Sequence, residues 1–270
     1  MPLSPAGRVL LAVAAAALAP GAARAQVTVT FLANEGVMLS AAGKKVLIDA
    51  LFLKYETGYA VPAATTRAAL EAARPPFDGV DLILVTHRHG DHFHPAPVAA
   101  HMRANPRATL LTSRQVIDSL RARVAPGDLA GPRIMARTPA PGARRREAVG
   151  GIVVELLGLP HGGRRHRAVE HIGYVVELGG RRVLHVGDTD FTEETFAAFR
   201  LDTARIDVAL LPYGAVTSRS GRRVIERWIR PRQVVAFHVG DREGDRVARQ
   251  VRAAMPGAVT FVRSLETRTW

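Results

Sequence analysis

The chain has no cysteine among its 270 residues. Disulfide bonds, thiolate metal ligands and nucleophilic thiols are therefore excluded, so a large apolar core has to stabilise the fold. Aromatic residues make up only 6% of the chain, and only three of its 37 basic residues are lysines. Nucleic-acid-binding surfaces usually combine clustered basic residues with aromatic side chains that stack on bases, whereas these arginines are scattered. In spite of the formal charge of +13, the sequence argues against nucleic acid as a partner.

Long apolar runs are missing after the first 25 residues, and residues 1–25 resemble a secretory signal peptide. Arg8 supplies a positive charge before an apolar run over 9–19, and Ala23-Arg24-Ala25 offers small residues for a cleavage site. The run is shorter than the roughly 20 residues that cross a bilayer. The sequence thus predicts export to the periplasm or the medium, residues 26–270 as one domain, and no membrane span after cleavage.

The most informative segment is 86–94, Thr-His-Arg-His-Gly-Asp-His-Phe-His, which directly follows an apolar, β-rich run. His87, His89, Asp91 and His92 are therefore expected to leave one strand end together. Imidazole and carboxylate are ligands that divalent transition metals accept. Four such groups within six residues exceed what one tetrahedral ion takes from a short segment. This spacing indicates two neighbouring ions, one at His87 and His89 and the other at Asp91 and His92.

The segment His87-Arg88-His89-Gly90-Asp91-His92 resembles the HxHxDH signature of the metallo-β-lactamase-fold hydrolases. That family has three further ligands after later strands, and this sequence offers them in order after apolar runs, as His161, Asp188 and His238. The resemblance extends from about residue 27 to the C-terminus. The strings 187–190 and 211–214 are most similar to the branch that contains ascorbate-6-phosphate lactonase.

The resemblance implies an α/β fold, an αββα sandwich of two mixed β-sheets with helices on the outer faces. It also implies two divalent cations, with zinc as the first expectation and manganese or iron as the alternatives. The implied ligands are His87, His89 and His161 for the first ion, Asp91, His92 and His238 for the second, and Asp188 as the bridge. A hydroxide shared by the ions would then attack an ester-like bond, such as a lactone, in a small-molecule substrate.

The order of the predicted elements also favours one α/β domain, because strands and helices alternate along the whole chain. Strands are expected at 27–32, 37–40, 45–49, 80–85, 109–111, 151–159, 171–186 (a hairpin), 206–211, 233–237 and 258–263. Helices are expected at 65–73, 95–104, 113–124, 193–200, 221–229 and 243–254. The segment 125–150 is expected to form loop or weak strands.

Other polar residues have expected roles beside the ligands. Asp91 is expected to orient the nucleophile and accept its proton, and Tyr213 to donate a hydrogen bond to the substrate oxyanion, with packing as the alternative. Asp49 is the expected acceptor for the second ring nitrogen of a ligand, with a strand-end cap as the alternative. His94 and His171 are expected to be structural, with substrate contact as the alternative. The histidines expected to have no part in the site are His101, His166 and His185.

Two other functions remain open at this point. A phosphodiesterase or nuclease of the same fold would use the same two ions on a phosphorus centre, although this length leaves no room for the additional domain that nuclease branches usually carry. A periplasmic metal-binding protein without catalysis is the other alternative. Substrate identity, the metal and the oligomeric state are left open by the sequence.

The predicted signal peptide also predicts the N-terminus of the exported, mature protein. The mature protein is expected to begin at Gln26, because signal peptidase cleaves after small residues such as Ala25. N-terminal sequencing of the protein from the periplasmic fraction checks this. Retention of residues 1–25 on soluble cytoplasmic protein would contradict it.

Overall fold

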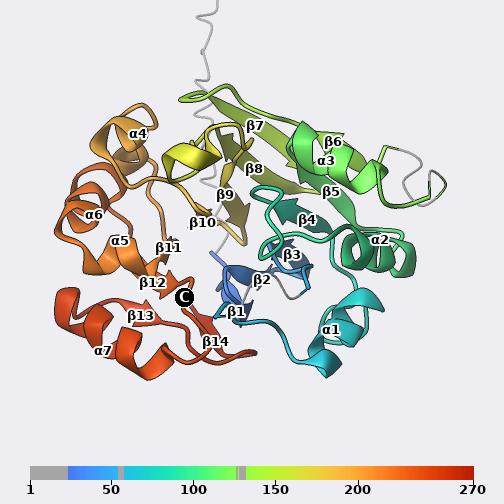
Figure 1. Ribbon diagram of the computed structural model, residues 1–270, viewed down its shortest axis with the longest axis horizontal. Helices are drawn as coiled ribbons and strands as arrows, with labels where there is room; N and C mark the ends of the chain where they lie inside the picture. Colours follow the sequence, from blue (N-terminus) through green and yellow to red (C-terminus); the bar gives the residue numbers. More distant parts are fainter. Residues whose placement is uncertain (1–23, 54–57, 126, 128–131) are drawn as a thin grey trace, which may run out of the picture.

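Two seven-stranded β-sheets pack face to face in the computed structural model, which describes residues 24–53, 58–125, 127 and 132–270 (Figure 1). The first sheet has the order β14-β1-β2-β3-β4-β5-β6, and the second has the order β13-β12-β11-β10-β9-β8-β7. In the first sheet the bounds are β14 Thr267–Thr269, β1 Thr28–Ala33, β2 Gly36–Ala41, β3 Lys44–Ile48, β4 Leu82–Val85, β5 Thr109–Thr112 and β6 Ile134–Ala136. In the second they are β7 Arg144–Val149, β8 Ile152–Leu157, β9 Gly173–Leu178, β10 Arg181–His185, β11 Val208–Pro212, β12 Gln233–Phe237 and β13 Val259–Thr260.

Helices cover the outer face of each sheet. Those over the first sheet are α1 Ala64–Glu71, α2 Pro95–Ala104 and α3 Arg114–Arg121. Those over the second are α4 Glu193–Ala197, α5 Tyr213–Thr217, α6 Arg219–Val224, the π-helix η4 Ile225–Ile229 and α7 Gly244–Ala254. Two short 3₁₀ turns, η2 Arg164–His166 and η3 Leu201–Thr203, complete the described elements. The predicted αββα sandwich is thus confirmed.

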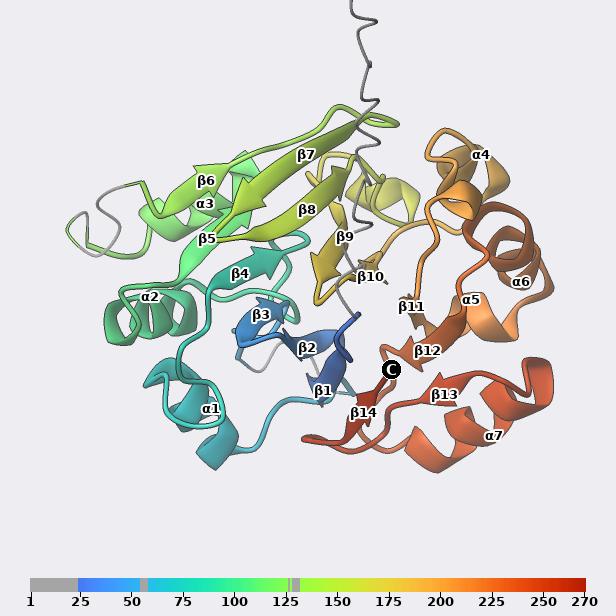
Figure 2. The same cartoon turned by 180° about the vertical axis from the view of Figure 1, so that it is seen from behind.

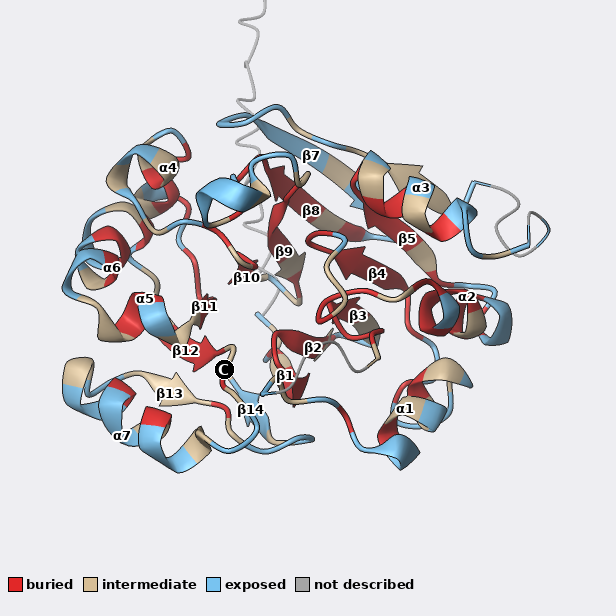
Figure 3. Cartoon of the chain, viewed as in Figure 1, coloured by how far each residue is buried: buried red, intermediate tan, exposed pale blue. Residues whose placement is uncertain are grey.

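Three apolar layers hold these elements together. The central layer lies between the sheets and is built from inward-facing strand residues such as Val46, Leu84, Val176 and Leu210. Each sheet also has an outer layer against its own helices, so strands near the middle are apolar on both faces. Figure 3 shows the result, with buried strands in the middle and helices that alternate between buried and exposed residues.

Both sheets change from antiparallel to parallel pairing at an equivalent place. β1, β2 and β3 pair antiparallel, whereas β3, β4, β5 and β6 pair parallel. In the second sheet, β7 to β10 pair antiparallel and β10 to β13 pair parallel. Because the carboxyl ends of parallel strands meet at one sheet edge, the loops after β3, β4, β10, β11 and β12 gather on one side of the molecule.

Most predicted elements are present, and the differences have physical reasons. The loop or weak strands expected over 125–150 include β7, an edge strand whose Arg144, Arg145 and Arg146 are exposed; charge of this kind protects an edge against pairing with another chain. The strand expected at 258–263 contains only β13. The polar strand β14 was not predicted, and it pairs with β1, so the last strand lies beside the first (Figure 2). Helix α5 was not predicted either.

The predicted signal peptide lies mostly outside the described residues, and of it only Arg24 and Ala25 are described. Arg24 Nε donates to Gly180 O at 2.6 Å, and its guanidinium pairs with Asp207 at 2.9 Å. Asp207 also accepts from Arg182 N at 2.9 Å. Within the described ranges, none of the helices combines the length and the apolar character needed to cross a membrane.

Two glycines of neighbouring helices give a matched test of packing. A Cβ on Gly221 in α6 would lie 2.2 Å from Ala215 O in α5, whereas a Cβ on Gly214 would meet nothing within 4 Å. Gly221→Ala is therefore expected to destabilise the protein by about 1–3 kcal/mol through overpacking. Gly214→Ala is expected to stabilise it by about 0.4–1 kcal/mol, because alanine reduces the entropy of the unfolded chain. Thermal unfolding measures both, and equal effects would contradict the packing described here.

Candidate metal centre

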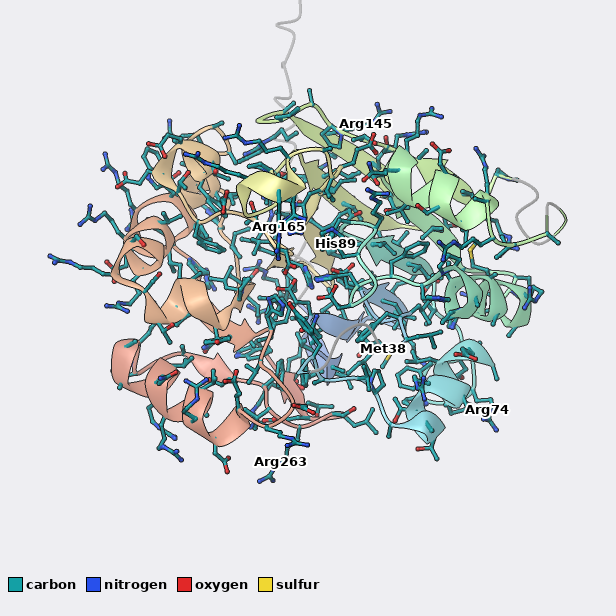
Figure 4. All side chains as sticks on the ribbon, in the orientation of Figure 1. Met38, Arg74, His89, Arg145, Arg165 and Arg263 are labelled. Atoms are coloured by element: carbon teal, nitrogen blue, oxygen red, sulfur yellow. The ribbon has the colours of Figure 1, made fainter. Side chains whose placement is uncertain are left out.

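The polar residues expected at the site converge at the sheet edge where the parallel strands end. Asp49 follows β3 directly, and the segment from His87 to His92 begins two residues after β4. Asp188 follows β10, His238 follows β12, and His161 lies in the loop after β8. Figure 4 labels His89, which lies between the two halves of the sandwich. Residues far apart in the sequence thus share one site.

Three imidazole nitrogens of His87, His89 and His161 point toward one another. His87 Nε2 lies 3.0 Å from His89 Nδ1, which lies 3.1 Å from His161 Nε2. Two nitrogens bound tetrahedrally to zinc at about 2.0–2.1 Å are themselves about 3.3 Å apart. The observed spacing is close to this value. His161 Nδ1 lies 2.8 Å from Gly162 O, to which it donates, so its Nε2 is left with a free lone pair.

Asp188 lies in the middle of the histidines. Its Oδ2 is 3.4 Å from His92 Nε2, 3.8 Å from His161 Nε2 and 4.0 Å from His87 Nε2. Its Oδ1 is 3.3 Å from His238 Nδ1. One carboxylate therefore faces both the group of three nitrogens and a second group formed by His92 and His238. Asp91 belongs to the second group, since its Oδ2 is 3.5 Å from His92 Nε2.

Asp49 fixes the orientation of His92 from behind. It is fully buried, and its Oδ2 lies 2.8 Å from His92 Nδ1. The same carboxylate accepts from Thr86 N at 2.7 Å and from Thr86 Oγ1 at 2.6 Å. With Nδ1 donating to Asp49, the neutral ring of His92 turns its Nε2 lone pair to the side of Asp188, where a cation would bind it. This is the arrangement that holds a histidine ligand in one tautomer.

Several buried polar atoms of the centre have no hydrogen-bond partner among the described residues. They are His92 Nε2, His171 Nε2, Asp188 Oδ1 and both carboxylate oxygens of Glu35. Such atoms are rare in folded proteins, because each loses its hydration without compensation. The geometry allows overlapping sets of three ligand atoms within 4.8 Å of one another, among them His87/His89/His161, His87/His92/Asp188 and Glu35/Asp188/His238. The residues present therefore fit divalent metal.

The electrostatic environment favours neutral imidazole rings at His87, His89 and His161, and it favours positive charge beside Asp188. Burial lowers the pKa of His87 well below its ordinary value and that of His89 to about 4. Burial alone would lower the pKa of His92 too, but Asp188 and Asp49 outweigh it and raise that pKa well above the ordinary value. Burial would raise the pKa of Asp188, yet His92 and His238 hold it well below its ordinary value. A bound cation meets the same demand for positive charge.

The backbone of the centre adopts conformations that most residues avoid. Asp49, His238 and Asn34 have φ values of 47°, 61° and 52°. Such left-handed positions cost of order 1–3 kcal/mol for residues other than glycine, and they persist only where the surroundings enforce them. Gly187, at φ 58°, has no room for a side chain, since a Cβ there would lie 2.6 Å from His171 Nε2 and 3.0 Å from Thr86 Cβ.

Sequence reasoning missed part of the site. His166 has its ring centroid 4.8 Å from that of His89 and 4.5 Å from that of His161, so it borders the group of three. His185 Nε2 lies 2.9 Å from Glu35 O, which places His185 behind the site. His166 therefore lies beside the centre although no role was expected for it, whereas His185 supports the turn that carries Glu35. Glu35 lies in the turn after β1, and its neighbours in the sequence are those of an ordinary turn residue.

Other candidates lie at the margin or outside. His171 is buried, with its ring centroid 5.2 Å from that of His87. His94 accepts from Ala96 N at 3.4 Å as the N-cap of α2. Tyr213 packs against the outer apolar layer of the second sheet, and the described contacts do not bring it to the histidines. Its catalytic role stays a prediction.

Arginines line two pockets beside the centre. One pocket, of about 320 Å³, is lined by His161 and His171 together with Arg164 and Arg167. A second, of about 450 Å³, is lined by His89 with Arg88, His94 and Arg123. Figure 4 shows Arg165, a residue of the η2 turn, to the left of His89. Both pockets therefore combine a residue of the centre with positive charge.

Comparisons with known proteins agree on one family. Residues 44–266 match the family described as "Beta-lactamase superfamily domain". The chain is 30% identical over 252 residues to a UPF0173 metal-dependent hydrolase from Polaromonas sp., with 86% of each covered. Among solved structures, it resembles Igni18, a metallo hydrolase from Ignicoccus hospitalis, at a TM-score of 0.60 and 19% identity over 91% of this chain and 98% of that one. It also resembles the metallo-β-lactamase-fold protein YhfI from Bacillus subtilis, at a TM-score of 0.61 and 11% identity over 91% and 100% of the two chains.

The role of Asp49 can be tested by metal affinity. Asp49→Asn is expected to weaken metal binding about 10–100-fold, because the amide no longer fixes the tautomer and ring of His92. The matched control is Asp81→Asn, at the opposite end of β4, where the carboxylate binds Lys44 Nζ at 3.1 Å and Lys45 N at 3.0 Å. That variant is expected to lose stability but keep wild-type affinity. Competition with a chromogenic chelator measures both; equal affinities would contradict the assigned role.

Proposed function

The chain belongs to the metallo-β-lactamase superfamily and is a metal-dependent hydrolase, and we propose that it uses two divalent ions to cleave an ester-like bond, such as a lactone, after export from the cell. The substrate class is a small molecule. Zinc is the first expectation for the metal, and manganese or iron are the alternatives, because all accept imidazole and carboxylate.

The observation that carries the proposal is the position of Asp188 between two groups of ligand atoms. Its Oδ2 lies within 4.0 Å of His87 and His161, and its Oδ1 lies 3.3 Å from His238. We assign the first ion to His87, His89 and His161, the second to Asp91, His92 and His238, and the bridging role to Asp188. Three protein ligands and a shared carboxylate leave each ion open to a further ligand, as catalytic sites require.

Bound ions of this kind lower the pKa of water to about 7 and polarise the bond under attack. The chain's own residues hold the geometry. Asn34 Nδ2 lies 3.3 Å from Asp91 Oδ2 and 3.3 Å from Asp91 O, so it restrains the carboxylate that we propose to orient the nucleophile and accept its proton. Asp91 is only 3% exposed, which limits competing solvent.

Phosphodiester hydrolysis is the second candidate, because arginines line the two pockets beside the centre. Arg88 and Arg123 line the pocket beside His89, and Arg164 and Arg167 line the pocket beside His161. Guanidinium groups bind phosphate oxygens through charge-assisted hydrogen bonds. A panel of lactone, carboxylic ester and phosphodiester substrates distinguishes the two, and a protein that only stores metal would hydrolyse none of them.

Metal content tests the proposed centre. The wild-type protein is expected to hold about two equivalents of divalent metal. His92→Ala and His238→Ala are each expected to retain one or fewer, because each removes a ligand of the second ion. Elemental analysis after dialysis measures this, with His94→Ala as the control that is expected to keep two equivalents. A folded native protein that binds no metal would contradict the proposal.

Metal removal tests the link to activity and stability. A chelator at neutral pH is expected to abolish hydrolysis and to lower the melting temperature, because the ions bind the folded state and not the unfolded one. Added metal is expected to restore both. Asp91→Ala should keep its fold and lose hydrolysis. Full activity after exhaustive chelation would show that these residues are not the catalytic centre.

A further inference from the structure

Glu35 occupies an unusual position for a residue in a turn between two strands. It lies between β1 and β2, yet it is fully buried, with 0% of its surface exposed. Its Oε1 is 3.4 Å from His238 Nδ1. Ligand atoms of Glu35, Asp188 and His238 lie within 4.8 Å of one another, and so do those of Glu35, Asp49 and His92. The carboxylate thus faces the second group of ligands.

The backbone around Glu35 is fixed from three sides. Gly187 N donates to His185 Nδ1 at 3.3 Å, so His185 Nε2 carries the proton and donates to Glu35 O at 2.9 Å. His238 N donates to Asn34 O at 3.0 Å. Gly36 packs so tightly that a Cβ there would lie 2.8 Å from Asp49 O. These contacts hold the turn against the loops that carry Asp49, Asp188 and His238.

An ordinary structural role would require a partner for this carboxylate. Glu155, a buried glutamate in the second sheet, shows the usual solution: Arg182 Nη2 lies 2.7 Å from its Oε1, and Arg144 Nη1 lies 3.4 Å from its Oε2. Neither carboxylate oxygen of Glu35 has a hydrogen-bond partner in the described chain. Asp188, Asp49 and Asp91 oppose its negative charge, and only His92 among the groups that act on it favours that charge. A buried carboxyl group without a partner is costly, so the structure lacks stabilisation that a cation would provide.

We propose that Glu35 is a further ligand of the second metal ion, alongside His238 and Asp188. This inference rests on the proposed two-ion centre. A ligand role for Glu35 makes the two metal positions chemically different. The first is bound mainly by nitrogen, whereas the second has the carboxylates of Glu35, Asp91 and Asp188. Six-coordinate sites rich in oxygen ligands suit manganese, and six-coordination would still leave the second ion one position besides its five protein ligands. The second position should therefore accept manganese more readily than the first.

The test is the metal content and metal affinity of Glu35→Gln, which keeps the size of the side chain and removes its charge. The second equivalent of metal is expected to bind about 10–100-fold more weakly, with the affinity for the first unchanged. The metal-free variant is expected to melt no lower than metal-free wild type, because the Glu35 carboxylate makes no hydrogen bond that the substitution would remove. On addition of Mn²⁺, the melting temperature of Glu35→Gln is expected to rise by less than that of wild type.

Two further variants complete the experiment. Glu155→Gln is the matched control; it should lower the melting temperature of the metal-free protein and leave both affinities unchanged. Glu35→Asp keeps the charge one methylene further back, and its second-ion affinity is expected between those of wild type and Glu35→Gln. If Glu35→Gln does not fold, Glu35→Asp decides, and a second-ion affinity equal to wild type overturns the inference.

The outcomes separate this inference from the proposed function. Two equivalents in wild type and tight binding of only one in Glu35→Gln support it. Two equivalents with wild-type affinities in both proteins overturn the role of Glu35 and leave the two-ion centre intact. A single equivalent in wild type overturns the two-ion centre, and the inference with it.

Discussion

The charge of Asp188 is the constraint on which the rest of the site depends. This carboxylate is only 16% exposed in its side chain, and four imidazoles have nitrogens within 4.0 Å of its oxygens. Burial of so many polar groups costs free energy unless positive charge compensates it. The fold supplies no arginine or lysine contact to Asp188 among its described ion pairs; it supplies imidazoles whose lone pairs converge instead. Divalent metal is the compensation that this chemistry fits, and the match to a family of metal-dependent hydrolases agrees with it.

The sandwich makes this concentration of polar groups possible. Parallel pairing brings the ends of β3 and β4 together in one sheet and those of β10, β11 and β12 together in the other. The central apolar layer then fixes the two sheets relative to each other, so that loops from both meet. The cost appears in the backbone, where Asp49 and His238 adopt positive φ values. Strain of this kind concentrates at functional sites because the surrounding core can enforce it.

The sequence predicted the parts of the site that follow from local pattern and family resemblance. The HxHxDH segment after an apolar strand identified His87, His89, Asp91 and His92, and the resemblance added His161, Asp188 and His238. Glu35 and His166 were not predicted, because their place depends on tertiary packing. A glutamate after Asn34 between two short strands is typical of an exposed turn. Only the contacts of His185 and His238 with this turn make it part of the centre. Likewise, β14 has no apolar alternation, and only its pairing with β1 defines it.

Anomalous diffraction from crystals of the metal-loaded protein tests the central claim most directly. The account predicts two peaks about 3.5–4 Å apart. One should be coordinated by the nitrogens of His87, His89 and His161, and the other should lie beside His238 and the carboxylate of Glu35, with Asp188 between them. A single peak, or metal bound away from Asp188, would contradict it.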